Sequence, residues 1–235
     1  MASTTMPLKH WLMKKLVTAK DNPPPEVVAG PGALRELGAI AKRLGMSKPL
    51  IVTDNVLVKI GLIKRCTHAL DTAGVGYSIY DKVVPNPHVG LVEEGFAVYQ
   101  AEGCDGLIAV GGGSPMDCCK TIGAKVLSGK EVEDMVGLFQ IAGMGKGKHH
   151  LFPPFMCVPT TAGTGSEATA GAIISFPEKK LKLLVGDAVL LPKVAILDPE
   201  VTATLPAHIT ARLAASWNEA HPTPISKIAA RMKTV

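Results

Sequence analysis

The feature that most constrains this chain is the stretch from Leu107 to Lys120, in which an apolar run ends in Gly111-Gly112-Gly113 and continues as Ser114-Pro115. The apolar run predicts a buried strand, and the glycines predict a tight turn into a helix. Ser114 suits the helix N-cap and Pro115 the first helical position, and Asp117 would form a capping-box-like pair with Ser114. Free N–H groups at such a helix start predict a phosphate-binding turn.

Two familiar phosphate-binding patterns are not matched by this stretch. Lys120-Thr121 resembles the end of a Walker A loop, but no glycine precedes the lysine, which falls inside the expected helix. The pattern G-x-G-x-x-G fails because Met116 stands three residues after Gly113. A glycine-rich turn without a ligand remains the alternative, so a dinucleotide site requires a second element.

The first 125 residues alternate between patterns typical of strands and of helices. Strands are expected at 26–29, 49–53, 74–80 and 107–110, and helices at 33–44, 56–73 and 89–102. This alternation predicts an α/β fold with a doubly wound, mostly parallel sheet of the Rossmann type. Ligands bind such sheets at the carboxyl ends of the strands, where the polar residues Asp54 and Asn86 and the turn at 112–114 are expected.

Asp54 follows the expected strand at 49–53 and has two interpretations. An acidic residue in this place can bind a ribose hydroxyl and repel a 2′-phosphate, which favours NAD over NADP. It can equally serve as the N-cap of the next helix.

A second strand-and-loop element supports a dinucleotide site. Apolar residues at 155–158 lead into Pro159-Thr-Thr-Ala-Gly-Thr-Gly-Ser166, a loop dense in hydroxyl groups and glycines. Its threonines, its serine and its backbone N–H groups can bind phosphate, ribose or a carboxamide. A loop that only caps and turns is the alternative, which the pairing with the glycine loop makes the weaker interpretation.

Composition narrows the class of protein. The net charge of +5 comes from scattered lysines without interleaved aromatic residues, which argues against nucleic acid as a partner. The sequence has no apolar run of about 18 residues, so we expect no membrane association. The five cysteines form no C-x-x-C pair, which favours reduced thiols, core packing for Cys118-Cys119 and a cytoplasmic location. The lysines in residues 1–20 leave an organellar transit segment open.

Residues 127–150 are polar and glycine-rich, and we expect a short helix followed by a mobile loop. The pair His149-His150 suggests a metal site. Adjacent histidines in a loop rich in lysine and glycine are more often solvated, so we favour a surface loop.

Taken together, the two loops resemble the iron-dependent (group III) alcohol dehydrogenase family. The resemblance covers about residues 25–211 and includes Pro85-Asn86-Pro87, the glycine loop, the threonine loop and Asp198-Pro199-Glu200. It implies an α/β dinucleotide-binding domain followed by an all-helical metal-binding domain. The activity it implies is NAD(P)-dependent oxidation of a small alcohol to an aldehyde or ketone, assisted by Fe²⁺ or Zn²⁺.

The resemblance also assigns the cofactor-binding residues. Asp54 matches the acidic residue at the adenosine ribose, Lys182 and Asn86 match cofactor-contacting side chains, and the segment from Val201 to Leu205 flanks the cofactor. The remaining matches lie in the two loops: Gly112, Gly113, Ser114 and Asp117 at the pyrophosphate, and Thr160, Thr161, Thr164 and Ser166 near phosphate and nicotinamide ribose.

The chain departs from the family after Thr210-Ala211. The family carries Asp and His four residues apart on the next helix, and this spacing puts both on one face as metal ligands. Here Ser216 and Ala220 stand at those positions, and Glu219 and His221 are too close in sequence to share a helix face. No metal ligand and no catalytic residue is therefore predicted, and we expect a truncated or frame-shifted form without the helical domain.

The predicted organisation is a leader or linker at 1–24, an NAD(P)-binding domain at 25–211 and a divergent tail at 212–235. The resemblance implies an NAD-dependent oxidoreductase that acts on an alcohol or aldehyde, and a homo-oligomer if the fold is intact. We expect this form to bind NAD without turnover. The alternatives are a non-catalytic NAD(H)-binding or assembly module and, less favoured, a metal-free synthase of cyclic polyols.

Overall fold

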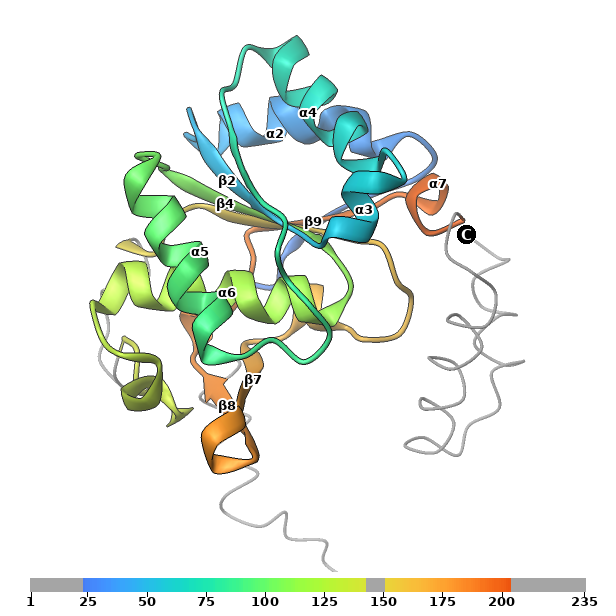
Figure 1. Ribbon diagram of the computed structural model, residues 1–235. Coiled ribbons are helices and arrows are strands. Elements are labelled where there is room, and N and C mark those ends of the chain that lie inside the picture. Colours follow the sequence, from blue (N-terminus) through green and yellow to red (C-terminus); the bar gives the residue numbers. More distant parts are fainter. Residues whose placement is uncertain (1–22, 143–150, 204–235) are drawn as a thin grey trace, which may run out of the picture.

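The computed structural model describes residues 23–142 and 151–203. Its centre is a six-stranded sheet in which every pairing of neighbouring strands is parallel (Figure 1). The strand order is β1 (Glu26–Ala29), β9 (Val194–Leu197), β6 (Phe155–Pro159), β4 (Gly106–Gly111), β2 (Pro49–Val52) and β3 (Ser78–Tyr80). The predicted doubly wound, Rossmann-like architecture is confirmed.

Helices cover both faces of this sheet (Figure 1). The 3₁₀ turn η1 (Ala33–Glu36), α2 (Leu37–Arg43) and α4 (Leu62–Ala73) pack on one face. On the other face lie α5 (Val89–Ala101) and α6 (Gly113–Ser128). Because successive side chains of a strand point to opposite faces, β2 sends Leu50 and Val52 to one core and Ile51 to the other.

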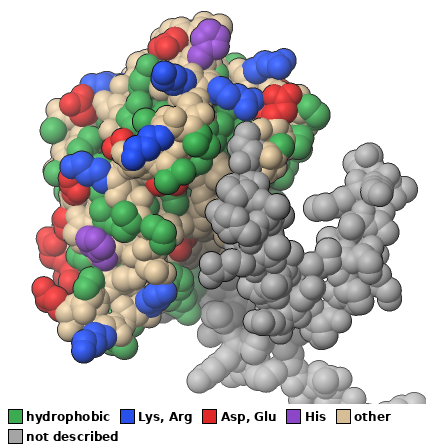
Figure 2. Space-filling view, turned by 45° about the vertical axis from the view of Figure 1, so that its right-hand side comes forward, with side chains coloured by type: hydrophobic (Ala, Val, Ile, Leu, Met, Phe, Trp, Pro, Cys, Tyr) green, Lys and Arg blue, Asp and Glu red, His purple; other side chains and the backbone are tan. Residues whose placement is uncertain are grey.

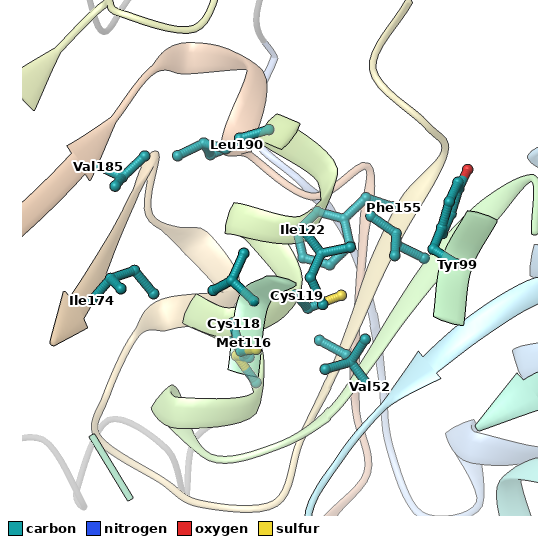
Figure 3. Close-up of a cluster of buried hydrophobic side chains, with 14 of the residues drawn as sticks. Val52, Tyr99, Met116, Cys118, Cys119, Ile122, Phe155, Ile174, Val185 and Leu190 are labelled. Carbon is teal, nitrogen blue, oxygen red and sulfur yellow. The ribbon is translucent and has the colours of Figure 1, made fainter. Parts of the chain in front are cut away.

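The core around α6 is built from aliphatic and sulfur-containing side chains. Figure 3 shows Met116, Cys118, Cys119 and Ile122 of α6 surrounded by side chains of the sheet and of a hairpin beyond it. All five cysteines are free and buried, as the core-packing interpretation predicts. Burial raises the pKa of the Cys118 and Cys119 thiols well above the usual value, so neither is a reactive thiolate.

Several helices differ in detail from the sequence-based expectation. The helix expected at 56–73 is two helices, α3 (Asn55–Lys59) and α4, separated by Gly61 with φ of 81°. A left-handed residue cannot continue an α-helix, and glycine adopts this conformation without steric strain. The expected helix at 33–44 begins as the 3₁₀ turn η1, and the strand expected at 74–80 is reduced to β3.

A second, three-stranded sheet was not predicted. It has the order β5 (Gly137–Leu138), β8 (Leu181–Gly186), β7 (Gly171–Phe176), and β7 and β8 form an antiparallel hairpin beside α6 (Figure 1). The short helix expected within 127–150 is the 3₁₀ turn η2 (Val132–Met135). His149-His150, most of the expected loop, the leader and the tail at 212–235 lie outside the described residues.

The surface carries charges of both signs. On the face drawn in Figure 2, basic and acidic side chains are interspersed with small apolar areas. Within 23–142 and 151–203, no helix has the length and hydropathy needed to cross a membrane.

Candidate dinucleotide-binding site

The predicted site residues gather where β2 and β4 lie side by side. The chain leaves β2 towards β3 at one edge of the sheet, and β4 pairs with β2 on its other side. Such a reversal of strand order opens a crevice at the carboxyl ends of the strands. Asp54 follows β2 and Gly112 follows β4, so both stand at the edge of the sheet where such a crevice is expected.

The glycine loop turns tightly into α6. Gly111 has φ of 150°, and a Cβ there would lie 2.5 Å from Cγ of Pro115. The N-cap is Gly112, so α6 begins two residues earlier than expected and Ser114 lies within its first turn. The predicted Ser114–Asp117 capping pair is therefore wrong. Among the described residues, no acceptor pairs with the N–H groups of Gly113 and Ser114, which leaves them available to an anion.

The threonine loop lies directly against the glycine loop. A Cβ on Gly112 would meet Oγ1 of Thr161 at 3.2 Å, and one on Gly113 would meet Cβ of Thr164 at 3.6 Å. The N–H of Thr160 donates to the carbonyl of Gly111 over 3.0 Å. The two loops, predicted separately, thus form one surface at the N-terminus of α6.

Oγ1 of Thr161 is a buried polar atom at this surface. It forms no hydrogen bond with any residue that the structure describes. A buried hydroxyl without a partner is costly. Its place beside Gly112 makes it a candidate partner for a bound ligand.

Asp117 and Ser166, both predicted to contact the cofactor, contact each other. The Ser166 hydroxyl donates to Oδ1 of Asp117 over 2.7 Å, and the Ile173 N–H donates to Oδ2 over 3.0 Å. Burial raises the pKa of the Asp117 carboxyl, and these two hydrogen bonds oppose the shift.

Lys120 is a residue whose role the sequence reasoning did not identify. It is fully buried, and its Nζ lies 2.7–3.0 Å from oxygen atoms of Ser166, Thr169 and Gly171. The resemblance of Lys120-Thr121 to a Walker A ending drew attention to it, but only the fold shows what the side chain binds.

Lys182 and Asn86 are also brought together. Nζ of Lys182 donates to Oδ1 of Asn86 over 2.7 Å, although one lies on β8 and the other precedes α5. The N–H of Ser175 donates to the carbonyl of Pro87 over 2.8 Å and fixes this loop to the hairpin. Asn86 has φ of 60°, a left-handed conformation that asparagine tolerates better than most residues.

Asp54 performs the capping role foreseen as one of its two interpretations. It is the N-cap of α3, and Oδ1 accepts from the Leu57 N–H over 2.9 Å. The residue is half-buried, so its second oxygen can still serve a ligand. Next to it, Oγ1 of the buried Thr53 is without a hydrogen-bond partner in the described part of the chain.

The last predicted segment reaches the site only in part. Val201, in α7 (Pro199–Thr202), is 1% exposed and packs in the core with α2 and α4, so its side chain does not face the crevice. Leu205 lies outside the described residues.

Asp198 is a second residue whose structural role was not predicted from the sequence. It is the N-cap of α7, and it accepts from the N–H groups of Gly32, Leu34 and Glu200 over 2.9–3.2 Å. The Asp-Pro-Glu pattern signals a helix N-cap. The contacts to the turn after β1 could not be found from sequence.

The described residues offer no metal centre. No three of their His, Cys, Asp and Glu side chains are grouped so as to hold a metal ion. Ser216 and Ala220, at the positions where the resemblance expects ligands, lie outside the described residues and carry no metal-binding group. The described residues by themselves therefore form no site for a resident Fe²⁺ or Zn²⁺.

Comparisons with known proteins show which proteins the chain resembles in sequence. The chain is 39% identical over 207 residues to choline dehydrogenase of Bacillus subtilis (strain 168), which covers 88% of this chain and 50% of that protein. It is 40% identical over 182 residues to lactaldehyde reductase of Escherichia coli (strain K12), covering 77% of this chain and 46% of that protein. The chain thus spans about half the length of these relatives.

Solved structures show the same fold. A crystal structure of 1,3-propanediol oxidoreductase matches with a TM-score of 0.76 and 35% identity, over 83% of this chain and 49% of the other. Sulfoacetaldehyde reductase from Bifidobacterium kashiwanohense, in complex with NAD⁺, matches with a TM-score of 0.72 and 30% identity, over 81% and 49%. The model of the family described as iron-containing alcohol dehydrogenase matches residues 24–199. The chain belongs to the iron-containing alcohol dehydrogenase family of oxidoreductases.

Proposed function

We propose that this chain binds NAD(H) in the crevice between the ends of β2 and β4. The observation that carries the proposal is the contact between the glycine and threonine loops at the N-terminus of α6. There, N–H groups of Gly113 and Ser114 and the hydroxyl of Thr161 have no partner among the described residues. Unpaired donors and the helix dipole together favour a pyrophosphate.

The other predicted residues are distributed around this point in an order that suits a dinucleotide. Gly112, Gly113 and Ser114 would hold the pyrophosphate, and Asp54 at the end of the neighbouring strand would hold the adenosine ribose. Lys182 would add a positive charge beside the phosphates, held in place by Asn86. Thr160, Thr161 and Thr164 would lie near the phosphates and the nicotinamide ribose.

The oxidoreductase activity of the family indicates the reaction in which a cofactor bound at this site would take part. We propose that NAD exchanges a hydride with a small alcohol or aldehyde in the family reaction. The residues of this chain bind and orient the cofactor. We further propose that the chain itself does not turn over alcohols, because Ser216 and Ala220 replace a pair of metal ligands. The alternative role is that of a non-catalytic NAD(H)-binding or assembly module, and metal-dependent alcohol oxidation by the chain would count against it.

The test is a fluorescence titration of the 235-residue chain with NADH, for the natural sequence and for Gly113→Ala. A methyl group on Gly113 would meet its nearest neighbour, Cβ of Thr164, at 3.6 Å, which is ordinary van der Waals contact, so the fold should tolerate it. The methyl would stand where the backbone must approach a phosphate. We expect saturable binding by the natural chain and affinity at least about tenfold weaker in Gly113→Ala.

Gly76→Ala is the matched control, since a Cβ there meets its nearest atom at 3.4 Å and lies far from the crevice in sequence and fold. It should leave NADH affinity unchanged. Added Fe²⁺ or Zn²⁺ should change neither the affinity nor the absence of alcohol-dependent NADH formation. No binding by a folded natural chain, or equal affinity of Gly113→Ala, would refute the site, and metal-dependent turnover would refute the proposed lack of activity.

A further inference from the structure

The side chain of Lys120, in the second turn of α6, is buried, and its ammonium group contacts the segment at 166–171. Its Nζ lies 2.7 Å from the carbonyl oxygens of Ser166 and Thr169 and 3.0 Å from the carbonyl oxygen of Gly171 and from Oγ1 of Thr169. A lysine ammonium has three protons to donate, and all are used here. Lys120 therefore has no donor left for a ligand.

Asp117, one helical turn earlier, contacts Ser166 in the same segment and Ile173 just beyond it. One carboxylate oxygen accepts from the Ser166 hydroxyl and the other from the N–H of Ile173 in β7. Residues three apart on a helix share a face, so Asp117 and Lys120 form one polar strip on the side of α6 that contacts this segment.

The segment that they hold has little else to fix it. Residues 161–170 contain no strand and only the 3₁₀ turn η4 (Ser166–Ala168), and Ser166 is the one buried residue among them. A segment with so few buried side chains has little packing energy to set its conformation. Apart from the N–H of Asp187, which donates to the carbonyl of Ala170 over 3.0 Å, the hydrogen bonds that tie this segment to the rest of the described protein run to α6.

Burial of the Asp117 and Lys120 charges has a desolvation cost. Burial lowers the pKa of Lys120, while nearby acidic groups, Asp117 and Glu167 among them, oppose that shift. A methionine would fill the same space without desolvating a charge, but it would leave the carbonyl oxygens without a donor. The ammonium therefore serves these contacts and not the packing of the helix.

We infer that Asp117 and Lys120 are positioning residues that hold the threonine loop in the conformation that receives the cofactor, without touching the cofactor themselves. The inference rests on the proposed NAD(H) site and changes the part of Asp117 in it. The side chain acts through Ser166 and Ile173 instead of facing the pyrophosphate. Loosening this strip frees Thr161 and Thr164 from the glycine loop.

The test compares Lys120→Met with Lys125→Met in the full chain. Lys125 is also a buried lysine of α6, but it pairs with Glu93 and Glu131, away from the threonine loop. If the free loop is competent about a tenth of the time, Lys120→Met binds NADH about tenfold more weakly. Lys125→Met should bind NADH as the natural chain does, even if it unfolds more easily.

Amide hydrogen exchange of the cofactor-free proteins distinguishes local loosening of the threonine loop from general destabilisation, because it is measured segment by segment. Faster exchange should be confined to residues 160–173 in Lys120→Met and should be absent from that segment in Lys125→Met. Equal NADH affinity of Lys120→Met and the natural chain, or equal effects of the two lysine variants, would overturn the inference.

Asp117 is tested by Asp117→Ala and Asp117→Asn. The asparagine can still accept one of the two hydrogen bonds without the negative charge, so it should retain more affinity than the alanine variant. Tighter NADH binding by both variants would show a carboxylate facing the phosphates and would overturn the inference. Failure of the natural chain to bind NADH would refute the proposed function itself, a result separate from unaffected binding by the variants.

Discussion

Lys182 donates a hydrogen bond from Nζ to Oδ1 of Asn86 over 2.7 Å, although the two residues are separated by 96 positions in the chain. Both side chains are exposed, and an exposed polar pair of this kind contributes little to stability, about 0–1 kcal/mol. In the proposed NAD(H) site, the pair would instead hold a lysine charge beside the phosphates. We therefore expect it to matter for binding more than for folding.

Replacing Lys182 should weaken NADH binding without destabilising the protein. We expect Lys182→Ala to raise the dissociation constant about tenfold and to reduce its dependence on salt, because one screened attraction to the phosphates is lost. Lys179→Ala is the control, since Lys179 lies over the Phe176 ring in the turn of the same hairpin. A titration with NADH at two salt concentrations measures both effects. Equal dissociation constants and equal salt dependence of the two variants would contradict the prediction.

Asp54 should determine the preference for NAD over NADP. Asp54→Asn keeps an N-cap acceptor for the Leu57 N–H, so stability should change by less than about 0.5 kcal/mol. The lost carboxylate no longer repels a 2′-phosphate, a gain of about 1–2 kcal/mol at short range in a solvated site. NADPH affinity should therefore rise about tenfold. Unchanged NADPH binding in a stable Asp54→Asn protein would show that Asp54 only caps α3.

Thr161→Val should separate binding from stability. The Oγ1 atom of Thr161 is buried and forms no hydrogen bond within the described part of the chain, so the nearly isosteric valine should leave thermal stability unchanged or raise it. NADH affinity should fall by about five- to tenfold if the cofactor is the missing partner. Thr72→Val on α4, where the hydroxyl bonds the His68 carbonyl, is the control for cofactor affinity. Full affinity in Thr161→Val would exclude this contact.

Asp198 should make stability depend on acid pH. Burial alone would raise the pKa of its carboxyl, but hydrogen bonds from the N–H groups of Leu34, Glu200 and Gly32 outweigh this and lower the pKa. A lowered folded-state pKa means that the stabilisation is complete above the unfolded pKa of about 4 and is lost as pH falls through the folded value.

Asp198→Ala should accordingly reduce the free energy of unfolding by about 1–3 kcal/mol at neutral pH, because it leaves N–H groups without an acceptor. Urea unfolding across the acid range should show the difference from the natural chain shrinking below a pH of about 4. A difference that stays constant with pH would contradict the assigned role of the charge.

The sequence by itself determined the fold class and the residues at the carboxyl ends of the strands. Apolar runs at 49–52, 106–110 and 155–158 each end in polar or glycine residues, and parallel strands place all such ends at one edge of a sheet. Local periodicity was sufficient for this, since burial on both faces of a parallel sheet leaves continuous apolar runs. The predicted start of α6 was two residues too late, because glycine as well as serine can occupy an N-cap.

Only the tertiary structure decided which of these residues touch. The β7–β8 hairpin was not predicted, and only β7 alternates between exposed or partly exposed and buried residues. The hairpin nevertheless brings Lys182 to Asn86 and Ile173 to Asp117. In the sequence, Lys120 resembles the lysine of a Walker A loop at the wrong position. The structure shows that it binds carbonyl oxygens 46–51 residues further along the chain. Contacts of this kind follow from strand order and packing, which depend on the whole core, whereas periodicity reports only which face of each element is buried.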